Sequence, residues 1–111
     1  MMNPEITDKY YTEKTKALNA LYEVADPELG INIVDLGLVY NITVNEAERK
    51  IVVEMTLSTR SCPLGGIITG HAKAAVEGAL EGFQAEVNLV WEPKWNADHI
   101  SAAGKALLGW S

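Results

Sequence analysis

The apolar positions of this 111-residue chain recur with two periods, one typical of helices and one typical of strands. From about Thr12 to Ala25 the spacing is helical, and one face of the predicted helix carries Leu18, Leu21, Tyr22 and Ala25. We expect this helix to end at Asp26, because Pro27 disfavours helical geometry in the residue before it. Asp26 and Glu28 are then predicted to lie in a loop.

Alternation of apolar and polar residues predicts three strands. The apolar positions of the first two are Leu38, Tyr40, Ile42 and Val44, followed by Ile51, Val53, Met55 and Leu57. The short polar connection from Asn45 to Lys50 joins these two strands most simply as an antiparallel hairpin. Val87, Leu89 and Trp91 predict the third strand, which Pro93 closes.

Two further segments have helical spacing. The first extends from Cys62 to near Gly82, and its stripe comprises Ile68, Ala72, Ala75, Val76, Ala79 and Phe83. The second contains Ile100, Ala103 and Leu107, with Asn96 or Asp98 available as its N-cap.

The element order is therefore α-β-β-α-β-α. It predicts a two-layer α/β domain with a small mixed three-stranded sheet, because each amphipathic helix must bury its apolar stripe. We expect a single domain over residues 1–111, with residues 1–11 as a flexible N-terminal segment.

Composition narrows the classes of function. Apolar residues make up 48% of the chain, which is enough for a core, and 15 acidic residues against 9 basic ones give a net charge of −6. Because the lysines and arginines form no cluster, nucleic acids and anionic membranes are poor partners. The sequence shows neither a signal peptide nor an apolar run of the ~20 residues that a membrane span needs. A cytoplasmic protein is expected, and a single cysteine fits a reducing compartment.

Cys62 is the most informative position in the chain. Pro63 is suited to the first position of a helix, so Cys62 is predicted to be its N-cap. The unpaired N–H groups of a helix start favour the thiolate and lower the cysteine pKa below its ordinary value of ~8.5. Arg60 adds positive charge, and Gly65 and Gly66 permit close approach to the backbone. A free cysteine is otherwise often a small buried hydrophobe, but this setting favours a functional thiol.

The chain has few soft ligands for a metal site of its own. One cysteine and two histidines fall short of the four donors that cluster and structural zinc sites usually need. His71 is nine residues beyond Cys62, on the opposite helix face and about 13 Å along its axis, so packing or surface exposure suits it better than ligation. His99 has no assigned role. A site shared between two chains, or with a partner, is the remaining metal hypothesis.

A cysteine nucleophile is the rival hypothesis. It needs a general base within reach, and no protease or amidase signature surrounds the cysteine. His99 with an acidic partner is the only candidate base that the sequence offers, and nothing places it near Cys62.

Three segments together resemble one known family. They are Asp26-Pro-Glu28 with Asn32-Ile-Val-Asp-Leu-Gly-Leu-Val-Tyr40, then Thr56-Leu-Ser-Thr-Arg-Ser-Cys-Pro63, then Pro93-Lys-Trp95 before a terminal helix. From about Leu18 to Trp110 the chain is similar to the small metal–sulfur cluster assembly factors related to SufT and PaaD. The resemblance implies a compact α/β domain that matures iron–sulfur clusters or delivers them to client proteins.

The resemblance also implies a site centred on Cys62. Its supporting residues are Asp26, Glu28, Asp35, Ser58 and Thr59. The chain departs from the family pattern at Arg60-Ser61, where the family often has Pro-Gly, and at Gly30-Ile31, where a proline is usual. The cysteine-rich extension of the PaaD branch and the nucleotide loop of the related carrier ATPases are absent from the sequence.

These observations lead to one functional hypothesis. We expect a non-enzymatic accessory factor in iron–sulfur cluster assembly, with Cys62 transiently holding iron or a cluster that is shared across a homodimer or with a partner. Its partners are expected to be the assembly machinery or client apo-proteins. The alternatives are a metal-free adaptor for the same partners and, less favoured, a cysteine-nucleophile enzyme.

Overall fold

The computed structural model describes residues 8–27, 29–57 and 65–109. The elements in chain order are α1 (Tyr11–Leu21), β1 (Val39–Asn45), β2 (Lys50–Met55), α2 (Gly65–Ala79), β3 (Gln84–Leu89), the 3₁₀ helix η1 (Ala97–His99) and α3 (Ala102–Leu107). This is a small α/β domain with the predicted order α-β-β-α-β-α, to which η1 is an unpredicted addition. None of the helices in these ranges is long and apolar enough to cross a membrane.

The three strands form one mixed sheet in the order β1-β2-β3. β1 and β2 pair antiparallel, with Val44 opposite Ile51, so the predicted hairpin is confirmed. β2 and β3 pair in parallel, with Val53 opposite Val87. A parallel pair requires a crossover connection, and α2 supplies it.

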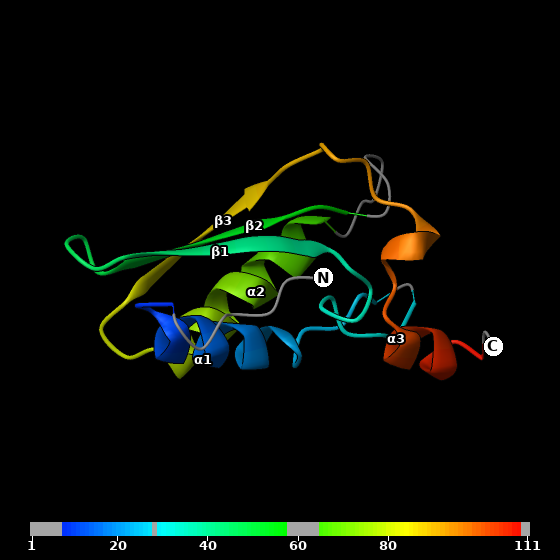
Figure 1. Ribbon diagram of the computed structural model, residues 1–111, viewed down its shortest axis with the longest axis horizontal. Helices are drawn as coiled ribbons and strands as arrows, with labels where there is room; N and C mark the ends of the chain where they lie inside the picture. Colours follow the sequence, from blue (N-terminus) through cyan, green and yellow to red (C-terminus); the bar gives the residue numbers. More distant parts are fainter. Residues whose placement is uncertain (1–7, 28, 58–64, 110–111) are drawn as a thin grey trace.

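Helices α1 and α2 lie together on one face of the sheet, whereas α3 lies at one end of the molecule (Figure 1). The buried side chains between these helices and the sheet include Leu18, Leu21, Ile42, Ile51, Val53, Met55, Ile68 and Val76. The opposite face of the hairpin carries exposed Asn41 and Thr43. This division follows from the period-two pattern, because successive strand residues point to opposite faces.

Several element boundaries differ from the prediction, since β2 ends at Met55 rather than Leu57, α2 at Ala79 rather than near Gly82, and β3 at Leu89 rather than Trp91. Helix α1 ends at Leu21, because the Val24 N–H donates to the Leu21 carbonyl in a tight turn and Ala25 forms an isolated antiparallel bridge with Asn32. Strand β3 begins at Gln84 rather than Val87, because the Gln84 N–H donates to the Arg49 carbonyl at 2.9 Å. The parallel ladder thus starts three residues earlier than the large apolar side chains do.

The N-cap of α3 also differs from the prediction. Ser101 caps this helix, since its hydroxyl accepts the Gly104 N–H. Asn96 instead caps η1 by accepting the Asp98 N–H. The predicted cap residue therefore serves the short helix that the sequence did not indicate.

Candidate functional site

The structure describes only part of the predicted site. Four of the predicted residues lie outside the described ranges, namely Glu28, Ser58, Thr59 and Cys62. The segment that carries the cysteine runs between Leu57 and Gly65, so the predicted cap at Cys62 stays a prediction. Asp26 and Asp35 are the two predicted site residues that the structure places.

The end of β2 that leads toward Cys62 is firmly held. The Val90 N–H donates to the Met55 carbonyl, and the Thr56 N–H donates to the Leu38 carbonyl, both at 2.8 Å. Met55 and Thr56 are buried, as is Leu57. Because hydrogen bonds reach this end from both sides, the last described residues before Cys62 are held in a fixed position.

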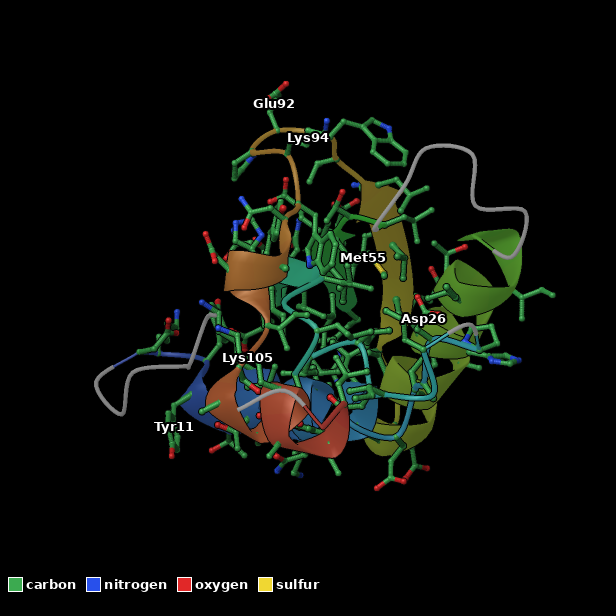
Figure 2. All side chains as sticks on the ribbon, turned by 90° about the vertical axis from the view of Figure 1, so that its right-hand side faces the viewer. Tyr11, Asp26, Met55, Glu92, Lys94 and Lys105 are labelled. Carbon is green, nitrogen blue, oxygen red and sulfur yellow. The ribbon has the colours of Figure 1, made fainter. Side chains whose placement is uncertain are left out.

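Asp26 is a buried carboxylate in the loop after α1, with only 3% of its surface exposed. Its backbone N–H donates to the Ile31 carbonyl at 2.9 Å, its carbonyl accepts the Gly30 N–H at 2.7 Å, and its Oδ1 accepts the Leu29 N–H at 3.2 Å. These bonds close a compact turn in which Gly30 has a positive φ of 71°. The two views place this loop at the same end of the molecule as Met55, the last residue of β2 (Figures 1 and 2).

Asp35 is engaged in a different network. Its Oδ2 accepts a hydrogen bond from the Asn32 side chain and its Oδ1 accepts one from the Ser101 hydroxyl, both at 2.8 Å. Its backbone carbonyl also accepts the Ser101 N–H at 2.7 Å. Asp35 therefore anchors the beginning of α3, a role that no local sequence signal indicates because its partner is 66 residues away.

The segment after β3 packs across the turn that precedes β1. The Trp95 indole N–H donates to the Leu36 carbonyl, and the Tyr40 hydroxyl donates to the Pro93 carbonyl, both at 2.7 Å. Trp95 is also partly buried and packs against the core cluster. These contacts hold the C-terminal segment against the chain that carries Asp35.

Two tyrosines near these networks have altered acidity. Burial, and then the charge of Asp35, raise the pKa of Tyr22. Burial, and then the charge of Glu92, raise the pKa of Tyr40. Both shifts favour the neutral phenol, the form in which Tyr40 donates its hydrogen bond to the Pro93 carbonyl.

The described residues offer little else for a metal. They contain no group of three or more histidine, cysteine, aspartate and glutamate side chains that could hold an ion. His71 is exposed on α2, as predicted for a surface residue. His99 packs edge-on against the Tyr40 ring at 6.0 Å, and its buried Nδ1 has no hydrogen-bond partner in the described part of the chain.

A match to a known protein family extends over most of the chain. Residues 14–89 match the model of a family described as iron-sulfur cluster assembly protein. The match includes the Asp26 loop, the hairpin, α2 and all of β3.

Two named relatives are similar to this chain over most of its length. The Fe-S protein maturation auxiliary factor YitW of Bacillus subtilis is 41% identical over 96 residues, which are 86% of this chain and 93% of that protein. The Fe-S protein maturation auxiliary factor SufT of Staphylococcus aureus is 44% identical over 86 residues, which are 78% of this chain and 97% of that protein. The full lengths of these relatives are therefore nearly matched.

Solved structures show the same fold. A domain of unknown function, DUF59, from Bacillus anthracis superposes with a TM-score of 0.82 at 36% identity and covers 88% of this chain and 92% of its own. The conserved hypothetical protein TM0487 from Thermotoga maritima has a TM-score of 0.73 at 34% identity, covering 97% and 99%. The predicted fold class is thus confirmed.

Proposed function

The chain belongs to the iron–sulfur cluster assembly protein family, and from this premise we propose that it is a non-enzymatic accessory factor that assembles or delivers clusters. The observation that carries the proposal is the near full-length match to two proteins that are both named Fe-S protein maturation auxiliary factors. Its partners are the assembly machinery or client apo-proteins. Iron or the cluster is cargo in this role.

We propose that Cys62 is the residue that handles the cargo. A thiolate is the soft ligand that iron–sulfur clusters require, and the chain has only this cysteine. The remaining ligands therefore come from a second copy or from a partner protein, so binding is transient and suited to transfer. Glu28, Ser58 and Thr59 are proposed to support the thiol.

The two described carboxylates fit a supporting role better than direct ligation. Asp26 is buried and fixes its own loop, while both Asp35 oxygens accept hydrogen bonds from neutral donors. We propose that Asp26 holds the loop that leads to Glu28 and that Asp35 holds the C-terminal segment in place. A cytoplasmic location suits this chemistry, because a free thiolate persists in a reducing compartment.

The direct test is anaerobic reconstitution with ferrous iron and sulfide, comparing the wild type with Cys62→Ser. We expect visible absorption from thiolate-bound iron in the wild type and its loss in the variant. Ser61→Ala is the matched control, because it changes the adjacent hydroxyl and keeps the thiol. Equal absorption by all three proteins would exclude the cysteine from the mechanism.

The metal-free adaptor is the second candidate, favoured by the small number of soft ligands in the sequence, one cysteine and two histidines. Under this alternative, Cys62→Ser retains both partner capture and maturation of a client enzyme in a deletion strain. Under our proposal, partner capture survives in Cys62→Ser and client maturation falls to the level of the deletion strain.

A further inference from the structure

β3 is an edge strand of the sheet, because among the described strands it pairs only with β2. On the inner side, the Gln84 N–H donates to Arg49 and the Val90 N–H donates to Met55. Backbone polar groups alternate in direction along a strand, so even-numbered residues of β3 face β2. The N–H and carbonyl groups of the odd-numbered residues Ala85, Val87 and Leu89 therefore point outward.

Only the first of these outward positions is covered in the described part of the chain. The Glu77 Oε2 on α2 accepts the Ala85 N–H at 3.0 Å. The outward N–H groups of Val87 and Leu89 have no partner among the described residues, and 39% of the Leu89 surface is exposed. An open strand edge with an exposed apolar side chain is a template for a further strand.

The charges beside this edge favour a second copy of the chain as the binding partner. A groove along it is lined by Lys50, Lys73, Glu77 and Glu86, two positive and two negative side chains, and the Lys50 ammonium lies 3.1 Å from the Glu86 carboxylate. The chain as a whole carries −6. Two copies therefore meet little local electrostatic repulsion at this balanced strip, whereas a strongly charged partner gains no attraction there.

We propose that two copies of the chain pair through β3, antiparallel about a two-fold axis at Val87, and so join their sheets into one. The Glu86 side chain disfavours the neighbouring register. An axis at Glu86 would set two Glu86 carboxylates directly opposite each other, which is destabilising. With the axis at Val87, Glu86 faces Asn88 of the second copy and Ala85 faces Leu89, so no like charges are opposed.

This interface rests on the proposed function, which names a second copy as one of two sources of the remaining ligands. Met55 at the end of β2 pairs with Leu89, so the chain toward Cys62 leaves from the Leu89 end of β3. In an antiparallel pair the two Leu89 ends point in opposite directions. The ends of the two β2 strands therefore lie on opposite sides of the two-fold axis.

Sedimentation velocity over a wide range of concentration tests the interface, with chelator and reductant present so that no metal or disulfide joins the copies. We expect a monomer–dimer equilibrium in the wild type and in Cys62→Ser. Val87→Pro removes an outward N–H and no bond to β2, and should weaken the dimer about tenfold to hundredfold. Val87→Ala is its control, because it trims the same side chain and keeps the N–H.

A second variant acts in the opposite direction. Glu77→Ala releases the Ala85 N–H to bond the second copy, so the dimer should tighten about tenfold, while Glu77→Gln keeps an acceptor and should resemble the wild type. A wild type that stays monomeric, or equal dissociation constants for Val87→Pro and Val87→Ala, overturns the interface. Cluster reconstitution on Cys62 is measured separately, so this inference can fail while the proposed function stands.

Circular dichroism first checks that Val87→Pro is folded. Should it not fold, hydrogen exchange of the wild type at low and high concentration decides the matter. Slower exchange of the Val87 and Leu89 amides at high concentration supports pairing through β3, and unchanged exchange contradicts it.

Discussion

Gly37 is a residue whose identity is imposed by tertiary structure. Its φ is 76°, and a Cβ at this position would overlap the backbone carbonyl of His99. We therefore expect Gly37→Ala to lower the free energy of unfolding by at least about 2 kcal/mol, since both the left-handed backbone and the collision are unfavourable. Urea denaturation followed by circular dichroism measures the change.

Gly30 provides the matched control for this prediction. Its φ is 71°, but a Cβ there meets no atom within 4 Å. Gly30→Ala should therefore cost only the backbone term of about 1 kcal/mol. Equal losses for the two variants would show that the packing of His99 on Gly37 contributes nothing.

The pKa of Glu86 is set by its neighbours on β2 and β3. The side-chain hydrogen bond from Asn88, followed by the hydrogen bond and the charge of Lys50, lower the pKa of Glu86. A lowered pKa stabilises the fold at pH above the ordinary glutamate value, and this stability is lost as pH falls through the lowered pKa. Carbon-detected NMR titration should show the pKa of Glu86 rising in Asn88→Ala and in Lys50→Met.

Lys73→Met is the control for the Glu86 titration. Lys73 lines the same groove, but the ion pair of Glu86 is made by Lys50. A similar rise in the Glu86 pKa in Lys73→Met and in Lys50→Met would contradict the assignment to specific hydrogen bonds.

Helix α3 is anchored at its start by Ser101. It has six residues, too few to be stable in isolation, and Ser101 both caps it and donates to Asp35. Ser101→Ala should cost about 1 to 2 kcal/mol and should accelerate hydrogen exchange of the Lys105 and Leu108 amides selectively. Asn96→Ala, which removes the η1 cap, is the control and should leave those two amides unchanged. Equal acceleration in both variants would argue against the anchor.

The sequence predicts these elements as far as local periodicity extends. The hairpin and the crossover helix follow from period-two and helical spacing in segments such as 51–57 and 68–76, where one face is buried. The early start of β3 could not be predicted, because Gln84 and Ala85 lack large apolar side chains, and Gln84 joins the sheet through a backbone bond to Arg49. Helix η1 forms where His99 packs on Gly37, a contact distant in sequence.

The candidate site was less predictable from the sequence than the fold. The three segments together, one of them around Cys62, indicate the family, and the family match agrees with this resemblance. The anchoring role of Asp35 was not predictable, since a carboxylate on a loop gives no sign that a serine near the other end of the chain will bind it. The role of Cys62 itself stays a prediction.

The charge of the whole molecule makes a dimer through β3 dependent on salt. Each copy carries −6, whereas the groove beside β3 has equal numbers of positive and negative side chains. Added salt screens the long-range repulsion between the copies, with a Debye length of about 10 Å at 0.1 M. It weakens little else, because the proposed interface depends on few attractive charge pairs. The dimer should therefore tighten severalfold as sodium chloride rises from about 0.05 to about 0.5 M, measured by sedimentation.

Reducing the net charge distinguishes this repulsion from other effects of salt. Glu23 and Asp98 are exposed on elements other than β3, so Glu23→Lys with Asp98→Lys lowers the negative charge and leaves the proposed interface intact. This double variant should dimerise more tightly at low salt and should depend less on salt than the wild type. A wild-type dimer that loosens as salt rises would instead be held by ion pairs across the interface, and the balanced strip along β3 would not be the surface that joins the copies.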